Sequence, residues 1–312
     1  MELFKLRGQI DFMRYRKPLA ILSIVLMTIS LASLLVRGLN LGLDFTGGTL
    51  IEVGYSQPVE LPDVRSALQK GGFTDAVAQH FGTSRDVLVR LAPRPNVSSA
   101  DLSTQVLEAL QAGTDMKVEM RRVEYVGPQV GNELIEQGGL AMLYALIGIF
   151  IYVMFRFEWR FSLGAIIATV HDVVLTLGLF SILGLEFDLV VLAAVLAVIG
   201  YSLNDTIVVF DRIRDNFRKL RKVDAVGVMN ISLNQTLSRT IMTSLTTLLV
   251  VLALFFLGGK IIHGFATALT FGIVIGTYSS IYIGSPAALW LGVSRADLVA
   301  PKKEGAELER RP

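Results

Sequence analysis

Charged side chains inside long apolar stretches are the residues of this 312-residue sequence that could do chemistry. Asp172 follows His171 in one such stretch, Asp205 lies in a second, and Arg239 stands at the start of a third. A carboxylate near the middle of a membrane helix costs about 2.5–3.5 kcal/mol on insertion scales, so each one needs a reason. Burial disfavours the charged form of a carboxylate, and a nearby arginine favours it. We therefore expect Asp205 and Arg239 to meet in the inner half of the membrane, with Asp205 as a proton-carrying carboxylate whose charged form Arg239 favours.

The same residues also allow structural interpretations. Asp205 could form a buried ion pair that only fixes helix packing. His171, Asp172 and Asn204 fit a packing hub as well as a relay station. An intramembrane aspartyl protease would need two carboxylates that share a proton. Asp205 follows Leu203 and Asn204 rather than the Gly-x-Gly context of such proteases, so we set that activity aside.

Composition excludes several other classes of function. Hydrophobic residues make up 52% of the chain and charged residues 18%, whereas a typical soluble domain has about 25% charged residues. The net charge of +2 gives no basic field for nucleic acid, and the chain has no cysteine. The three histidines are dispersed, and the phosphate-loop and His-Glu-x-x-His motifs do not occur. We expect neither catalysis nor a metal nor a bound cofactor.

Six segments approach or exceed the length needed to cross a bilayer, whose core of roughly 30 Å needs about 20 apolar helical residues. They cover residues 18–36, 138–155, 162–184, 189–210, 240–257 and 264–291. The last could be broken near Pro286. The first is longer than the apolar region of a signal peptide, and no small-residue cleavage site follows it. We interpret it as a retained membrane helix.

Lysine and arginine residues predict the orientation, because short cytoplasmic loops are enriched in them. They gather in the tail 1–17, near residues 156–160, in a basic loop at about 211–239 and in the tail 293–312. On the other side, the short loops carry only Lys260. We therefore predict a multi-pass protein of the cytoplasmic membrane with both termini in the cytoplasm.

Residues 37–137 are predicted to form one mildly acidic external domain. The expected elements are a strand at 49–55, a helix at 62–71, strands at 77–81 and 87–91 around a turn at 82–85, a helix at 99–111 and a strand at 116–126. This β-α-β-β-α-β order is the ferredoxin-like, split βαβ arrangement, an α+β fold. The fold indicates no particular activity, although one sheet face would be free to dock something. Glu186 and Asp188, in an outer loop, are expected to be solvated.

Small residues at strict i+4 spacing on the sixth segment predict a flat packing face for another helix, in this chain or in a partner. They are Gly264, Ala268, Gly272, Gly276, Ser280 and Gly284. On the fifth segment, hydroxyl residues could satisfy buried groups or line a wet path. They are Thr240, Thr243, Ser244 and Thr247.

Five motifs together resemble the SecD/SecF family of protein-export membrane proteins. The first, Asp44-Phe45-Thr46-Gly47-Gly48, opens the external domain. The others are VGPQVGNEL at 126–134, GYSLNDTIVVFDRIR at 200–214, SLNQTLSRT at 232–240 and GTYSS at 276–280. They cover the chain from Asp44 to about Trp290 and show no departure from the family pattern at Asp205 or Arg239.

The resemblance implies a half of a resistance-nodulation-division bundle, with six helices here and six more from SecD. It implies that the pair joins the SecYEG channel, often with YajC and YidC, and acts on an unfolded polypeptide in transit. The proton gradient would complete export across the inner membrane after the SecA step. Within the family, the residues that correspond to Asp205 and Arg239 are implicated in proton passage.

Two alternatives remain open at this point. A small-molecule or lipid exporter of the same superfamily would share the helices and the proton site, but it would usually carry the second half of the bundle in the same chain. A purely structural subunit would bind SecD without any role for the carboxylate of Asp205.

Overall fold

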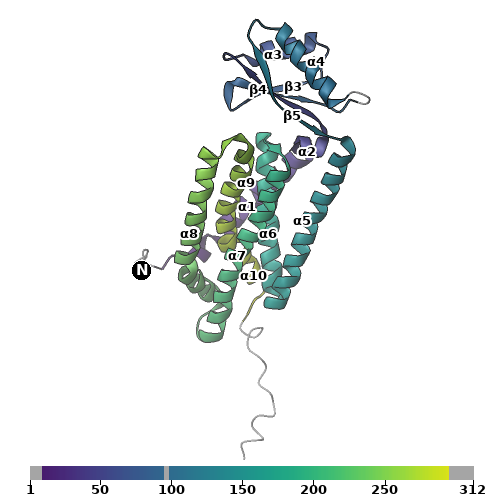
Figure 1. The fold of residues 1–312 in the computed structure, drawn as a ribbon. Helices are drawn as coiled ribbons and strands as arrows, with labels where there is room; N and C mark the ends of the chain where they lie inside the picture. Colours follow the sequence, from purple (N-terminus) through teal and green to yellow (C-terminus); the bar gives the residue numbers. More distant parts are fainter. Residues whose placement is uncertain (1–8, 95–97, 295–312) are drawn as a thin grey trace, which may run out of the picture.

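The computed structural model describes residues 9–94 and 98–294, with an α+β domain at one end of a long helical bundle (Figure 1). We call the bundle end that carries this domain the domain end, and the other the far end. Several residues that contribute to the predicted orientation, among them Lys5, Arg7 and Arg295, lie outside the described ranges.

Six spans in the described ranges are long and apolar enough to cross a membrane. Five are α1 (Arg16–Val36, preceded by η1, Phe12–Tyr15), α5 (Pro128–Arg156), α6 (Trp159–Leu183), α7 (Leu189–Lys219) and α8 (Ala225–Leu257). The sixth joins α9 (Gly259–Ser279), the π-helical turn η2 (Ser280–Gly284) and α10 (Ser285–Trp290). The expected break therefore occurs just before Pro286, as a π turn. The predicted fold class, a helical membrane protein with six spans, is confirmed.

The predicted basic loop at 211–239 is wrong. Helix α7 continues to Lys219 and α8 begins at Ala225, so only residues 220–224 separate them. Asp224 caps α8 by accepting a hydrogen bond from the backbone N–H of Gly227 at 3.1 Å. Asn216 holds the two extensions together through Ser232 (2.9 Å) and Gln235 (2.8 Å). An apolar stretch of sequence marks only the part of a helix that lies in the membrane core. Helices α7 and α8 continue beyond that part as amphipathic helices.

The α+β domain is an antiparallel four-stranded sheet with two helices on one face (Figure 1). Its elements are β2 (Gly48–Tyr55), α3 (Leu61–Lys70), β3 (Val77–Phe81), β4 (Thr83–Leu91), α4 (Ser99–Ala112) and β5 (Val118–Val126). The strand order β3-β4-β2-β5 is that of the predicted ferredoxin-like fold. The predicted turn at 82–85 is shorter, because Gly82 reverses the chain with a φ of 82° and β4 begins at Thr83.

A neck joins this domain to the bundle. The two-residue strand β1 (Asn40–Leu41) pairs in parallel with β6 (Glu186–Phe187), which lies between α6 and α7. The short helix α2 (Leu43–Thr46) follows, and its Phe45 ring lies 5.9 Å from that of Phe187. Helix α5 begins at Pro128, ten residues before the predicted membrane segment at 138. Residues 37–47 and 128–137 therefore belong to the neck and α5 rather than to the sheet domain.

Small residues of α9 let it pack directly on α7. A Cβ at Gly264 would lie 2.9 Å from Val191, and one at Gly276 would lie 3.0 Å from Ser202. A Cβ at Gly272 would overlap the side chain of Val198. The small-residue face thus seats a helix of this same chain. Gly284, beyond the π turn, instead faces Ala168 and Phe210.

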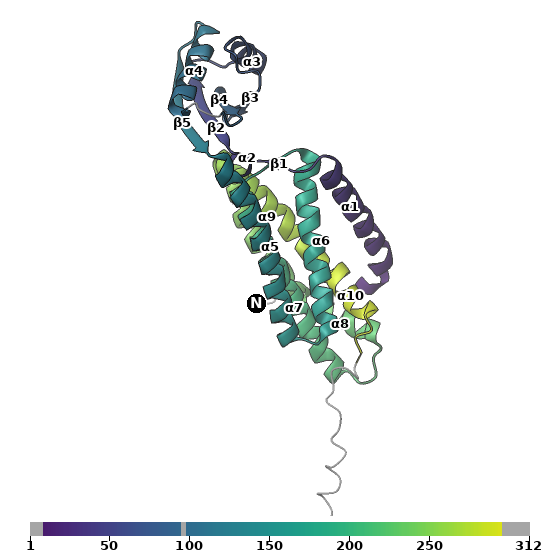
Figure 2. The same ribbon diagram turned by 90° about the vertical axis from the view of Figure 1, so that its right-hand side faces the viewer.

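Helix α1 lies at the edge of the bundle beside α6 (Figure 2). Ser30 of α1 packs so closely on Gly178 of α6 that a Cβ at Gly178 would overlap it. Most other side chains of α1 are exposed. This one-sided packing leaves α1 with a long unpartnered surface.

Candidate functional site

Asp172 is the centre of a buried polar cluster that joins three helices. Its side chain on α6 is fully buried. One carboxylate oxygen accepts a hydrogen bond from Nδ1 of His171 at 2.8 Å. The other accepts hydrogen bonds from Ser202 of α7 and from Ser279 of α9, the latter at 2.6 Å. Charge-assisted bonds of this kind are about twice as strong as neutral ones, so the geometry favours the packing hub.

His171 extends this cluster towards α1. With Nδ1 donating to Asp172, Nε2 is left as an acceptor, and this buried atom has no hydrogen-bond partner in the described structure. The imidazole lies 6.2 Å from the ring of Tyr278. The hydroxyl of Tyr278 in turn donates to the carbonyl of Leu19 at 2.9 Å and lies 2.8 Å from that of Ser23. The α6–α9 cluster therefore also anchors α1.

Asp205 on α7 has a different environment. Its side chain is only 2% exposed and makes no ion pair within the described residues. The hydroxyl of Ser244 on α8 donates to it at 3.4 Å, and Thr243 also contacts it. A distance of 3.4 Å is long for an O–H···O bond, which is commonly about 2.7 Å. The carboxylate of Asp205 is thus buried but weakly held, unlike that of Asp172.

A chain of hydroxyl groups leads from Asp205 to the backbone of α9. Ser244 lies 2.7 Å from the hydroxyl of Thr277, which lies 2.9 Å from the carbonyl of Ile273. When Asp205 is protonated, it can donate to Ser244, Ser244 to Thr277, and Thr277 to the carbonyl. When Asp205 is ionised, the two hydroxyl protons turn towards it. The protonation state of one carboxylate is therefore coupled to hydrogen bonds on α8 and α9.

Arg239 does not meet Asp205 as an ion pair in this structure. It lies well inside α8, and its exposed side chain lines a polar pocket of about 370 Å³ between α7 and α8. The same pocket contains Asn204, Asp211 and Asp215. The apolar pattern begins only after residue 239 and so predicts Arg239 at the start of the helix, whereas α8 begins at Ala225. Arg239 affects Asp205 only through its charge.

Asn204 also lies apart from the Asp172 cluster. Its side chain is exposed and lines the pocket that contains Arg239. Neighbouring residues on a helix point in different directions, so Asn204 and Asp205 cannot share one face. The predicted group of His171, Asp172 and Asn204 is therefore split between two places.

The Asp44–Gly48 motif builds the neck. Asp44 accepts a hydrogen bond from the N–H of Leu189 at 3.0 Å, and Asp188 accepts one from that of Val191 at 2.7 Å. Both carboxylates thus stabilise the start of α7. Gly47 and Gly48 have φ values of 66° and 126°, which glycine adopts readily, and a Cβ at Gly48 would overlap the carbonyl of Leu91.

Glu186 and Asp188 are half-buried rather than solvated as expected. Burial raises the pKa of Glu186, and the charge of Arg90, 3.7 Å away, partly offsets this effect. Burial also raises the pKa of Asp188, and its hydrogen bond from Val191 partly offsets it. No local pattern predicts this burial, because it depends on the pairing of β1 with β6.

Two partners of Asp172, Ser202 and Ser279, escaped the sequence analysis. Both lie inside family motifs, where a serine in an apolar helix is the available signal. Residues 9–94 and 98–294 contain no group of three or more His, Asp or Glu residues that could hold a metal ion.

Two family models match the chain. The model described as the C-terminal part of the protein export membrane protein SecD/SecF matches residues 106–294. The SecD/SecF GG motif model matches residues 32–59, which include Gly47 and Gly48. The positive φ values of both glycines, and the lack of space for a Cβ at Gly48, explain why glycine is needed in this motif.

Several curated relatives are named protein translocase subunit SecF. The one from Vibrio alginolyticus is 54% identical and covers 100% of this chain and 99% of its own length. The one from Pseudomonas aeruginosa is 52% identical over 95% of each chain.

The crystal structure of SecDF from Thermus thermophilus, described as a translocon-associated membrane protein, matches with a TM-score of 0.83 and 40% identity over 93% of this chain. A SecDF structure in the super-membrane-facing form matches with a TM-score of 0.70. This chain spans 39% of each SecDF chain. With family models and full-length relatives in agreement, the chain belongs to the SecD/SecF family of protein export membrane proteins.

Proposed function

We propose that this chain is the SecF-type subunit of a bacterial protein translocase. With a separate SecD subunit, it uses the proton motive force to complete the export of unfolded polypeptides across the inner membrane after the SecA step. The names of its full-length relatives support the translocase role. The SecDF chain, of which this chain matches 39%, supports SecD as the partner. SecYEG, with YajC and YidC, completes the proposed assembly.

The proposed orientation places both termini and the far end in the cytoplasm. The described basic residues at the far end support it, because short cytoplasmic loops are rich in lysine and arginine. They include Arg156, Arg160, Arg212, Arg214, Arg218 and Lys219. The α+β domain then faces the periplasm.

The buried, weakly held carboxylate of Asp205 is the observation on which the proton-driven mechanism rests. A proton that binds there neutralises the buried charge and reverses the hydroxyl chain through Ser244 and Thr277. The proton leaves towards the polar pocket that contains Arg239, at the cytoplasmic end. A single protonation event thus changes hydrogen bonds on α7, α8 and α9 together.

The energy of one proton sets a limit on this mechanism. A charge that crosses 100 mV supplies about 2.3 kcal/mol, whereas a shift of a two-state equilibrium from 1:99 to 99:1 needs about 5.5 kcal/mol. Each export step therefore uses more than one proton or starts from two conformations of nearly equal free energy.

Asp205→Asn tests the proposal, because the amide of asparagine neither binds nor releases a proton near neutral pH. We expect export of a secreted reporter to lose its dependence on the proton motive force, while SecD still co-purifies. Asp115→Asn is the matched control, since it makes the same chemical change at an exposed residue of the α+β domain, outside the proposed proton path. Normal export by Asp205→Asn would instead indicate a purely structural subunit.

A further inference from the structure

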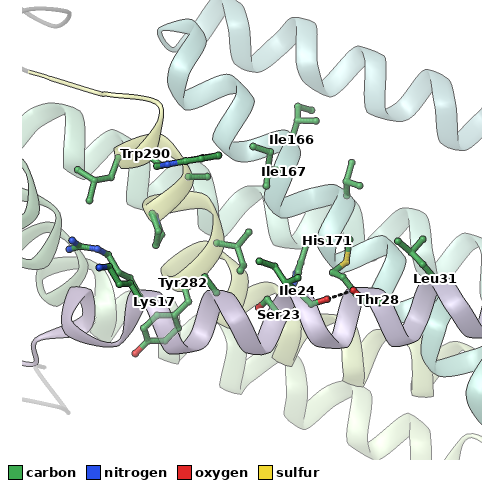
Figure 3. Close-up of a pocket in the computed structure, with 18 residues that line it drawn as sticks. Lys17, Ser23, Ile24, Thr28, Leu31, Ile166, Ile167, His171, Tyr282 and Trp290 are labelled. Carbon is green, nitrogen blue, oxygen red and sulfur yellow. Dashed lines mark hydrogen bonds between the residues drawn. The ribbon is translucent and has the colours of Figure 1, made fainter.

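A groove of about 1000 Å³ runs along α1 on the outer surface of the bundle. Figure 3 shows side chains of α1, α6 and the η2–α10 segment facing one another across it. The walls are mostly apolar, with Ile24, Met27 and Leu31 on one side and Ile167 and Val170 on the other. None of this belongs to the Asp205 site.

One end of the groove is basic and aromatic. Arg16 and Lys17 line it there, and neither makes an ion pair within the described residues. Trp290 lies at the same end, opposite the Leu31 end (Figure 3), and its side chain is 88% exposed. Basic and tryptophan side chains together are typical of the level of lipid headgroups.

The length of the groove indicates what it holds. The lining residues of α1 run from Arg16 to Leu31, a helical rise of about 22 Å. A bilayer core is roughly 30 Å thick, so the groove starts at one headgroup level and ends inside the bilayer without reaching the opposite side. It fits acyl chains that begin at the headgroup level and end inside the bilayer.

We propose that this groove is a binding site for an anionic phospholipid of the cytoplasmic leaflet. Arg16 and Lys17 bind the phosphate and a negatively charged headgroup, and the apolar walls hold the acyl chains. The lipid supplies to α1 the packing surface that the protein leaves open. This inference depends on the orientation in the proposed function but not on the role of Asp205.

The two tryptophans of the chain provide a direct assay. In the full-length Trp159→Phe variant, Trp290 at the groove is the only tryptophan of the chain, and its emission is excited selectively. Phosphatidylglycerol with brominated acyl chains is titrated into the detergent-solubilised protein, and brominated phosphatidylcholine is titrated in parallel. We expect saturable quenching by phosphatidylglycerol at concentrations where phosphatidylcholine quenches weakly.

Charge and shape variants then locate the site. Arg16→Gln and Lys17→Gln should each weaken the apparent affinity about fivefold, in keeping with the usual contribution of a basic residue near an anionic membrane surface. Arg14→Gln is the matched control, because it removes a neighbouring charge outside the groove. Ala20→Phe, which fills the groove without a change of charge, should abolish saturable quenching.

Three results would overturn the proposal. Equal quenching by the two lipids, or equal effects of Arg14→Gln and Lys17→Gln, would indicate only the general lipid annulus. Loss of quenching when the SecD complex is formed would indicate that the partner covers the groove. A failure of the Asp205→Asn export assay would leave the lipid result unchanged, so the two proposals are separable.

Discussion

At the scale of single residues, two buried aspartates on adjacent helices have opposite surroundings. Asp172 accepts bonds from His171, Ser202 and Ser279, whereas Asp205 has a long bond from Ser244. A carboxylate with three donors is suited to hold helices together. One with a weak partner is suited to change its charge.

Asp172→Ala should therefore destabilise the protein strongly. It leaves three buried donors without an acceptor, and the loss of one member of a buried charged network typically costs about 3–5 kcal/mol. Ser202→Ala removes one hydrogen bond and should cost about 1 kcal/mol. Thermal unfolding in detergent compares them, with the exposed Asp115→Ala as control. Equal unfolding temperatures for Asp172→Ala and Asp115→Ala would contradict the hub.

Glu186 gives a pH-dependent contribution to stability. Its pKa is raised above the ordinary value of 4.5 in the folded protein. Such a carboxyl favours folding below 4.5, and that contribution is lost as the pH rises through the raised value. Glu186→Gln should therefore reduce the fall in unfolding temperature between about pH 4.5 and 8. Glu108→Gln, an exposed carboxylate on α4, should leave the wild-type pH profile unchanged; identical profiles for both variants would exclude this role.

At the scale of elements, the contact of α9 with α7 depends on the absence of side chains. Gly272→Ala forces a Cβ against Val198 and should destabilise the protein by about 1–3 kcal/mol, the usual cost of overpacking. Gly148→Ala is the matched control, because this glycine of α5 has open space around its Cβ position. Chemical unfolding in detergent measures both. A stabilising effect of Gly272→Ala would mean that the two helices separate without cost.

At the scale of the whole molecule, Arg90 connects the sheet to the neck. From β4 it donates to the carbonyl of Leu41 at 2.9 Å and to the hydroxyl of Thr46 at 3.1 Å, and it lies near Glu186. Besides the two chain connections, Arg90 thus ties the domain to the neck, and a side-chain hydrogen bond between Gln79 of β3 and Glu186 joins them at the same junction.

Arg90→Ala should loosen the domain without unfolding it. We expect faster hydrogen exchange at residues 41–48, because their contacts with β4 are weakened. Arg65→Ala is the control, since Arg65 bonds to the carbonyl of Ala78 within the same domain. Unchanged exchange at the neck would show that Arg90 does not hold the domain in place.

The sequence by itself determined the six spans, the alternating strands of the domain and the burial of Asp172 and Asp205. These features follow from local patterns, because span length and sheet alternation depend only on neighbouring residues. The extent of the helices beyond the membrane was not visible in those patterns, since polar residues continue α7 and α8.

The tertiary structure decided which partners each charge receives. Ser279 lies 107 residues from Asp172 in the sequence, and Ser244 lies 39 residues from Asp205. Arg239, by contrast, faces the polar pocket because of the rotation of α8 against α7. The lipid-sized groove lies where α1 packs against α6 and the η2 turn, while most other side chains of α1 stay exposed. Such contacts depend on how helices rotate and cross, which no local pattern specifies.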